Sequence, residues 1–292
     1  MSIAPERELS ARSIIDGQKE SFREIEKKDF CPNEVGRTEY LLPSLVSSLS
    51  LFQREISAET AIRKFIKSRG RCVVLDLGCG AGFWLANKNE EHGKSFEGYG
   101  VSASDYRKPE QRQPLIVEER EENGEKRRFL RSIDSLSVYF GYLYLLEEAR
   151  VDDAHYFQGD IHGLLRQFTE EKFDVIVSHQ TCRYLFDPLR ALKGVYRVLK
   201  KGGFAFLESL KPIIFDSDDK QLSFEQIGEL FNKNGYKVFI GKYWPDPDHI
   251  REGLSFKKDK KSRLSLPDII YRGIIPNPYS HNSLVVTYQL KS

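Results

Sequence analysis

Three glycines at alternate positions follow an acidic residue at the end of an apolar run. Residues 73–77 contain Asp76, and Gly78, Gly80 and Gly82 come directly after them. Because glycine has no Cβ, it accepts φ > 0 in a tight turn and lets a ligand lie against the backbone. The unpaired N–H groups of a helix that starts there favour an anionic group such as a carboxylate. The pattern predicts a nucleotide-type binding turn at the carboxyl end of a buried strand.

A second set of polar residues follows an apolar run at 173–178. Ser178 ends this run, and His179, Gln180 and Tyr184 come after it. His179 is a candidate general base, because an imidazole exchanges its proton near neutral pH. The alternative, in which His179 packs or bonds to a cofactor without proton transfer, stays open. Cys182 is interpreted as a small buried residue and not as a nucleophile.

Short apolar runs alternate with segments of helical periodicity. Strands are predicted at 72–77, up to 102, at 155–158, 173–178 and 204–208, and helices at 83–91, 133–149, beyond 160 and at 189–199. This alternation predicts an α/β fold with a parallel sheet and helices on both faces. Further on, a helix at 224–232 and strands at 236–240 and 283–290 are expected.

The remaining segments surround this alternation. Apolar residues from Tyr40 to Ile66 recur at helical spacing with a break near Ser57, so one or two amphipathic helices, closed by Gly70, are expected before the glycines. Residues 105–131 read as an inserted loop or small hairpin around the Asn123-Gly124 turn signal, with a solvated excursion favoured over a substrate lid. Residues 242–280 are expected to form an irregular excursion.

Composition bounds the class of protein. The chain has 292 residues, 40% hydrophobic and 12% aromatic, which is enough to bury a core. A net charge of +2 is too small to imply a nucleic-acid partner by itself. We expect neither a signal peptide nor a membrane span, and the four cysteines, which lack metal-ligand spacing, are expected to be reduced thiols. These features predict a cytoplasmic protein with no metal site.

Four segments together resemble class I S-adenosylmethionine-dependent methyltransferases over roughly residues 70–290. They are Val74-Leu75-Asp76-Leu77-Gly78-Cys79-Gly80-Ala81-Gly82, Gln158-Gly159-Asp160, residues 173–178, and Arg197-Val198-Leu199-Lys200-Lys201-Gly202-Gly203-Phe204. A dinucleotide-binding domain fits less well, because Phe83 stands where its fingerprint has the last glycine.

The resemblance implies a three-layer α-β-α Rossmann-like sandwich. Its mostly parallel seven-stranded sheet would have an antiparallel last strand beside the fifth, supplied by the closing strands of the chain. Residues 1–69 would form an N-terminal extension and helical cap, and residues 70–292 the methyltransferase domain, with insertions at about 105–131 and 242–280.

The resemblance also implies S-adenosylmethionine as cofactor. Asp76 would order the glycine turn or meet the cofactor's amino group, and Asp160 would accept a hydrogen bond from the adenine amine. The full set of implied cofactor residues is Tyr40, Asp76, Gly78, Cys79, Gly80, Gly82, Ser102, Asp160, Ile161 and Ser178. His179, Gln180 and Tyr184 would lie near the acceptor.

One position departs from the family pattern. Ser102 stands where the family usually has an acid that accepts both ribose hydroxyls. A neutral hydroxyl can bond one ribose oxygen, but more weakly than a charged acceptor. Asp105, three residues further on, is an alternative acceptor.

The leading hypothesis is a methyltransferase that acts on a small molecule or a protein side chain. An RNA methyltransferase is an alternative, motivated by Lys126, Arg127, Arg128, Arg131 and the lysines at 257–261, but these charges are interleaved with acids. A non-catalytic scaffold that retains the fold is a third hypothesis, motivated by Ser102. The sequence specifies neither the acceptor nor the oligomeric state.

Overall fold

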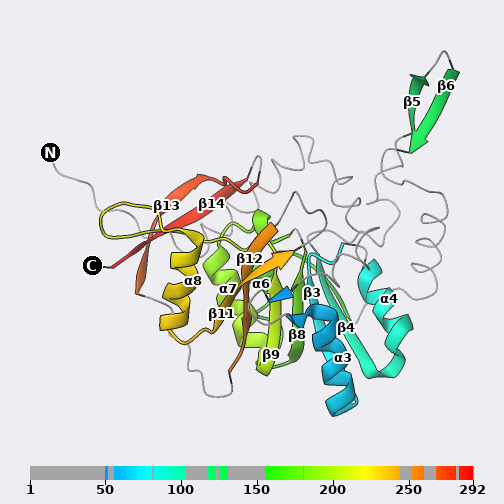
Figure 1. Cartoon of the computed structure of the whole chain (residues 1–292), viewed down its shortest axis with the longest axis horizontal. Helices are drawn as coiled ribbons and strands as arrows, with labels where there is room; N and C mark the ends of the chain where they lie inside the picture. Colours follow the sequence, from blue (N-terminus) through cyan, green and yellow to red (C-terminus); the bar gives the residue numbers. More distant parts are fainter. Residues whose placement is uncertain are drawn as a thin grey trace.

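The computed structural model describes most of the chain beyond residue 56. The described residues are 50–51, 56–80, 82–102, 117–122, 125–130, 155–179, 181–243, 251–259, 268–280 and 283–291. Figure 1 shows a central sheet with helices packed against it and a smaller sheet beside the carboxyl end of the chain. Among the helices described, none is long and apolar enough to cross a membrane.

Seven strands of the nine-stranded central sheet match the predicted seven-stranded sheet, in the order β7-β4-β3-β8-β9-β12-β11. Their bounds are Tyr156–Gln158 (β7), Phe96–Ser102 (β4), Cys72–Leu77 (β3), Phe173–Ser178 (β8), Leu199–Leu207 (β9), Arg251–Lys257 (β12) and Val238–Tyr243 (β11). Strands β7, β4, β3, β8 and β9 run parallel, whereas β12 is antiparallel to both of its neighbours. The predicted mostly parallel sheet with one antiparallel strand is confirmed.

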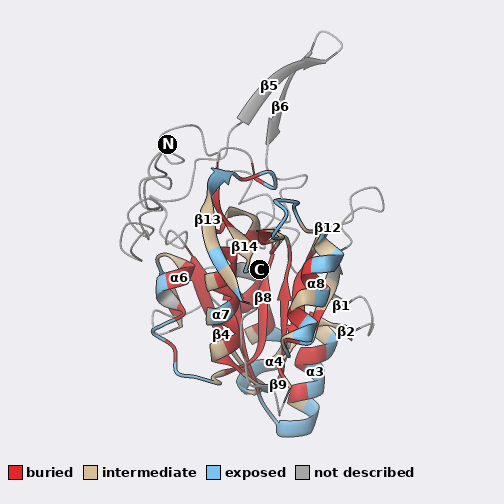
Figure 2. Ribbon diagram, turned by 90° about the vertical axis from the view of Figure 1, so that its left-hand side faces the viewer, coloured by how far each residue is buried: buried red, intermediate tan, exposed pale blue. Residues whose placement is uncertain are grey.

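The helices form a layer on each face of this sheet. Their bounds are Ala58–Arg69 (α3), Phe83–His92 (α4), Ile161–Leu164 (α6), Pro188–Val198 (α7) and Phe224–Lys233 (α8). Alternate residues of β3 serve the two faces, because Val74 belongs to the buried cluster that includes α3 and α4, while Leu75 belongs to the cluster that includes α6, α7 and α8. Figure 2 shows the central strands buried and the outer helix surfaces exposed. The three-layer sandwich is therefore confirmed.

Helix α3 begins and ends where the sequence predicted. The Ser57 hydroxyl accepts a hydrogen bond from the Thr60 N–H and caps the helix, and Gly70 closes it in the left-handed region at φ 73°. Ahead of Ser57, the predicted helix is wrong where the structure describes the chain. Ser50–Leu51 (β1) and Ile56–Ser57 (β2) pair antiparallel and extend the sheet beyond β11. Residues 1–49 of the predicted cap lie outside the described residues.

The strand beside β9 is not the one that the sequence analysis expected. Leu284–Leu290 (β14) pairs with Ile213–Phe215 (β10) and Ile269–Pro276 (β13) in a separate three-stranded sheet. The antiparallel position is taken by β12, so residues 242–280 are not an irregular excursion throughout. Gly253 permits this arrangement, since a Cβ there would lie 2.0 Å from the Leu207 carbonyl oxygen.

The predicted hairpin in the 105–131 insertion is confirmed. Val117–Glu122 (β5) and Glu125–Leu130 (β6) pair antiparallel on either side of Asn123 and Gly124 in the sequence. Figure 1 shows this hairpin standing apart from the central sheet. The helix predicted at 133–149 lies outside the described residues.

Candidate functional site

The turn after β3 depends on three glycines in the left-handed region. Gly78, Gly80 and Gly82 all have positive φ, at 84°, 56° and 83°. The Gly78 and Cys79 N–H groups donate to the Val101 carbonyl at 2.7 and 3.0 Å, which joins the turn to β4. A Cβ at Gly78 would lie 1.8 Å from the Thr181 hydroxyl oxygen. The turn therefore requires glycine for its dihedral angles and for its packing against the segment after β8.

The turn leads into a helix without a side-chain cap. Gly82 occupies the N-cap of α4 and has no side chain to accept from the first N–H groups. Such a helix start favours an anionic group, as the sequence analysis predicted for this position. The Cys79 side chain faces the other way, because its sulfur lies 2.5 Å from where a Cβ of Gly100 would be. The Cys79 side chain is therefore packed toward β4 and buried.

Sequence reasoning missed Tyr156, which fixes the turn from β7. The Tyr156 hydroxyl donates to the Gly80 carbonyl, and the side chain is 6% exposed. Strand β7 is two strands away from β3, so this contact spans β4 at the carboxyl edge of the sheet. The signal available in the sequence was the position of Tyr156 two residues before Gln158-Gly159-Asp160, at the start of a strand ending at the same edge.

The other strand ends bring the expected residues to this edge. Asp76 is 4% exposed and Ser102 3% exposed, on the adjacent strands β3 and β4. The Ser178 hydroxyl donates to the Leu77 carbonyl at 3.0 Å and accepts from the Cys182 thiol, which joins β8 to β3. Burial raises the pKa of the Cys182 thiol to about 12, which fits its interpretation as a small buried residue.

Asp160 and Ile161 lie where β7 passes into α6. Asp160 caps α6 by accepting from the His162 backbone N–H at 3.2 Å. The same oxygen, Oδ1, lies 2.7 Å from His162 Nδ1. Ile161 is the first residue of α6 and is 7% exposed. Asp105, Tyr40 and Gln180 lie outside the described residues.

A buried pair joins the ends of β8 and β9. His179 Nδ1 contacts Glu208 Oε2, and the two residues are 7% and 3% exposed. The parallel register places Ser178 opposite Leu207, so the next residue of each strand lies beside the other. Glu208 was not among the predicted site residues. The sequence could have indicated Glu208, because it stands at the end of the predicted strand 204–208. That strand was expected beside the strand that ends in Ser178.

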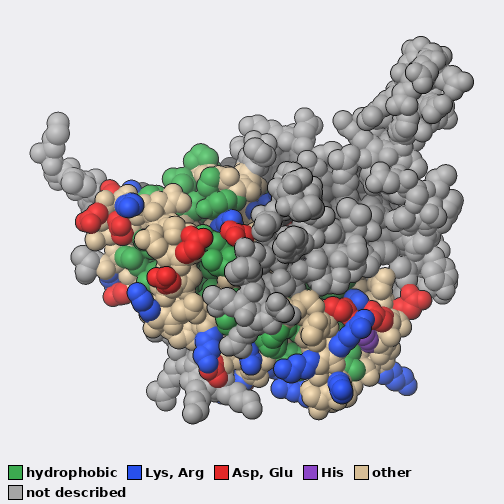
Figure 3. Space-filling view, viewed as in Figure 1, with side chains coloured by type: hydrophobic (Ala, Val, Ile, Leu, Met, Phe, Trp, Pro, Cys, Tyr) green, Lys and Arg blue, Asp and Glu red, His purple; other side chains and the backbone are tan. Residues whose placement is uncertain are grey.

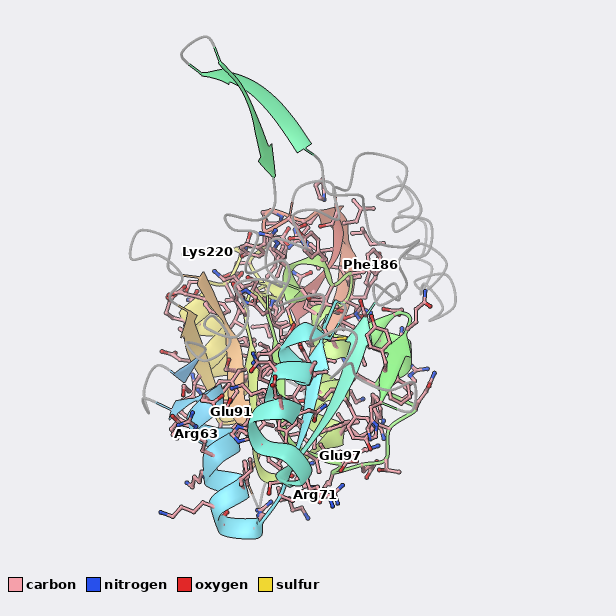
Figure 4. All side chains as sticks on the ribbon, turned by 90° about the vertical axis from the view of Figure 1, so that its right-hand side faces the viewer. Arg63, Arg71, Glu91, Glu97, Phe186 and Lys220 are labelled. Atoms are coloured by element: carbon pink, nitrogen blue, oxygen red, sulfur yellow. The ribbon has the colours of Figure 1, made fainter. Side chains whose placement is uncertain are left out.

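The segment after His179 carries Tyr184 and is fixed by the C-terminal sheet. Cys182–Tyr184 forms a short 3-10 helix (η3), and the Arg183 guanidinium donates to the Tyr184 hydroxyl at 2.7 Å. The Asn277 amide donates to the Arg183 carbonyl at 2.6 Å. The Phe186 carbonyl accepts from the Val286 N–H, and Figure 4 shows Phe186 close to these C-terminal strands. The small sheet therefore braces the segment that carries Tyr184.

A group of metal-ligating residue types lies elsewhere, between α3 and α4. Glu59, Glu91 and His92 have ligand atoms within 4.8 Å of one another. Lys88 lies 2.8 Å from Glu59 and also contacts Glu91, and Arg63 lies 3.1 Å from Glu91, as Figure 4 shows for the labelled pair. The side chains of Lys88 and Arg63 neutralise the two carboxylates, as a metal ion would otherwise do. The cluster is therefore an ion-pair network between the two helices.

Comparison with known protein families identifies the family of this chain. A family model described as "Methyltransferase domain" matches residues 39–252, more than half of the 292-residue chain. No curated protein matches the chain. The match ends at the start of β12, so strands β13 and β14 lie beyond it.

Two solved structures illustrate the structural similarity. One is the 1,6-didemethyltoxoflavin-N1-methyltransferase of Burkholderia thailandensis, a structure that contains 1,6-didemethyltoxoflavin and S-adenosylhomocysteine. The two sequences are 14% identical, the match covers 82% of this chain and 90% of that chain, and the TM-score is 0.42. The other is a SAM-dependent methyltransferase from Aquifex aeolicus, with 16% identity, coverage of 80% and 97%, and a TM-score of 0.38. At these identities and scores the similarity does not bear on function.

Proposed function

Since the chain belongs to the methyltransferase-domain family, whose methyl donor is S-adenosylmethionine, we propose that it methylates an oxygen or nitrogen of a small-molecule or protein acceptor, with His179 as the general base. When bound, the cofactor supplies a methyl group already activated on a sulfonium. Catalysis then consists mainly of orienting the acceptor and removing its proton.

The described residues fit this cofactor. Gly78, Gly80 and Gly82 keep the turn after β3 in the left-handed region and without Cβ atoms, so a ligand can lie against its backbone, and the uncapped start of α4 suits a carboxylate. Asp76, near the end of β3, would meet the cationic amino group of the cofactor. Ser102 would bond the ribose, and Asp160 would accept from the adenine amine. The order of these residues along the sheet edge follows the order β3-β4-β7.

The observation that carries the proposed base is the buried contact between His179 and Glu208. The Glu208 carboxylate beside Nδ1 favours the neutral tautomer that carries its hydrogen on that nitrogen, because the N–H is the positive end of the ring. In that tautomer Nε2 is the basic nitrogen. Glu208 also stabilises the imidazolium that forms when Nε2 takes a proton. His179 would act as the base and Glu208 as the residue that orients it.

Three of the basic residues that motivated an RNA acceptor, Lys126, Arg128 and Lys258, lie opposite acids or donate to the backbone, whereas Arg127 lies opposite Arg120. Lys258 is 6% exposed, and its ammonium donates to the Tyr196 and Leu199 carbonyls at the end of α7. In the β5–β6 register, Lys126 lies opposite Glu121 and Arg128 opposite Glu119. On the face shown in Figure 3, basic side chains lie among acidic ones. These positions weigh against an RNA acceptor, and the absence of RNA affinity at low salt would agree with them.

The test separates cofactor binding from proton transfer. Calorimetry with S-adenosylhomocysteine measures binding, and mass spectrometry measures its formation from S-adenosylmethionine with a panel of phenols, amines and peptides. We expect His179→Ala to bind the cofactor within about threefold of wild type and to lose turnover by about 10²–10⁴-fold. His155→Gln is the matched control. His155 also lies beside an acid, Glu97, but it precedes β7, at the end of that strand away from Asp160. This variant should leave cofactor binding and turnover unchanged.

Two results would contradict the proposal. Failure of the wild-type protein to bind S-adenosylhomocysteine at millimolar concentration would remove the cofactor site. Turnover by His179→Ala equal to that of wild type would remove His179 as the base and leave the cofactor site standing.

A further inference from the structure

A buried histidine lies behind the predicted adenine site and takes no part in the proposed methyl transfer. His162, the second residue of α6, has a side chain that is 1% exposed. Its Nδ1 lies 2.7 Å from Asp160 Oδ1, and its Nε2 lies 2.9 Å from the Asp187 carbonyl oxygen. Turning the ring over would replace both nitrogens by carbons and lose both contacts, so the two contacts define the ring orientation.

The two contacts of the His162 ring show how many protons it shares with its partners. The Asp187 carbonyl accepts only, so Nε2 must carry a hydrogen and donate it. A neutral imidazole has one N–H, which leaves Nδ1 without a hydrogen to donate to Asp160. The contact at 2.7 Å therefore contains one further proton, held either by His162 or by the Asp160 carboxyl group.

The proton belongs to His162. A carboxyl group is ordinarily more acidic than an imidazolium by more than two pKa units, about 3.9 against about 6.5. Burial alone raises the pKa of Asp160, but the hydrogen bond from His162 and its charge outweigh burial and lower the pKa of Asp160 below its usual value. The Asp160 side chain is also 32% exposed, so water solvates part of its charge. The pair is an imidazolium and a carboxylate.

The partner on the other side of His162 is itself fixed. Asp187 caps α7 by accepting from the Arg190 N–H at 3.0 Å, and its carboxylate also accepts from the Tyr288 hydroxyl of β14. These contacts hold the Asp187 backbone in place, and its carbonyl holds the ring. Asp160 is consequently oriented from behind by a cation that cannot rotate freely.

We propose that His162 is a positioning residue for the cofactor, holding the Asp160 carboxylate so that one of its oxygens accepts from the adenine amino group. Both contacts of the carboxylate with His162 use Oδ1, which assigns Oδ2 to the ligand. This inference rests on the proposed function, because the role of Asp160 at adenine is part of it. It extends the adenine site to a residue that touches no part of the cofactor.

The experiment compares two ligands that differ at position 6 of the purine ring and in the hydrogen on the neighbouring N1. S-adenosylhomocysteine carries the amine, whereas S-inosylhomocysteine has a carbonyl oxygen that a carboxylate repels. Their dissociation constants are measured by calorimetry for wild type, His162→Gln, Asp160→Asn and the control His155→Gln. For wild type and His155→Gln we expect a preference of at least about tenfold for S-adenosylhomocysteine, the range of one hydrogen bond to a charged acceptor.

His162→Gln retains a donor for the Asp187 carbonyl and has no charge, and we expect its preference to fall below about threefold. A merely structural role would weaken both ligands equally and leave the preference at the wild-type value, which would overturn the inference. If Asp160→Asn also leaves the preference unchanged, the adenine assignment of the proposed function fails instead. His162→Asn is the second neutral variant, to be used if His162→Gln does not fold.

Discussion

Replacing Gly78 by alanine should damage both the stability of the protein and its cofactor site, through two separable effects. The residue has φ 84°, in the left-handed region, and an alanine there costs about 1–2 kcal/mol. The new Cβ would also lie 1.8 Å from Thr181 Oγ1 and 2.5 Å from Thr181 Cβ. Forcing such a contact into a packed site costs about 1–3 kcal/mol more. The sum predicts a loss of about 2–5 kcal/mol in the free energy of unfolding.

Two further variants separate the effects. Gly70, at the end of α3, has φ 73° and open space around its missing Cβ, so Gly70→Ala should cost the backbone part alone. Thr181→Gly removes all three atoms that the new Cβ at position 78 would strike, so Gly78→Ala made in that background should cost no more than Gly70→Ala. The assay is urea unfolding followed by circular dichroism and fluorescence, whose transitions should coincide.

Cofactor binding gives the second readout. Gly78→Ala must displace Thr181 or reshape the turn, so we expect affinity for S-adenosylhomocysteine to fall more than about tenfold, whereas Gly70→Ala should bind as wild type. Equal costs for Gly78→Ala with and without Thr181→Gly would refute the steric argument. Unchanged affinity in Gly78→Ala would refute the placement of the cofactor at this turn.

Two other predictions concern the core. Asp174→Ala leaves the Val73 N–H without its acceptor at 2.9 Å and should destabilise the protein by about 1–3 kcal/mol, while the exposed control Asp268→Ala should cost less than about 0.5 kcal/mol; equal losses by urea unfolding would count against this. The Cys31→Ser variant keeps three cysteines, Cys72, Cys79 and Cys182, all of them buried. Because burial raises the pKa of the Cys182 thiol to about 12, we expect Ellman's reagent at pH 8 to leave this thiol unmodified until urea unfolds the protein. Rapid labelling of Cys182 in the folded protein would contradict its burial.

The elements that the sequence predicted correctly are those defined by local spacing. The run at 72–77 is β3 residue for residue, because six consecutive apolar or acidic residues end at a glycine with positive φ. Ser57 and Gly70 bound α3 because a hydroxyl and a glycine satisfy the orphan groups of a helix end. These signals act over a few residues and do not depend on the rest of the fold.

The choice of the strand beside β9 depended on contacts that no local pattern contains. Residues 284–290 have the stronger β character, yet the position belongs to β12, which includes two buried apolar residues, Leu254 and Phe256, and the close approach of Gly253. Both segments contain apolar residues at alternate positions, so periodicity could not rank them. The ranking comes from the end of β9, where the Ser209 N–H donates to the Glu252 carbonyl.

The pairing of His179 with Glu208 lies between these two cases. Each residue directly follows a strand of the sheet, and parallel neighbours end at the same edge, so the sequence alone contained the elements of the pair. What it lacked was the register, Ser178 opposite Leu207, which a shift of one residue would have destroyed by moving one side chain to the other face. The same reasoning applies to His162, whose partners Asp160 and Asp187 lie two and 25 residues away: the near contact could be predicted from a helix cap, and the far one only from the packing of α6 against α7. The residues proposed to touch the cofactor were therefore predictable from motifs, whereas the residues proposed to orient them required the three-dimensional arrangement.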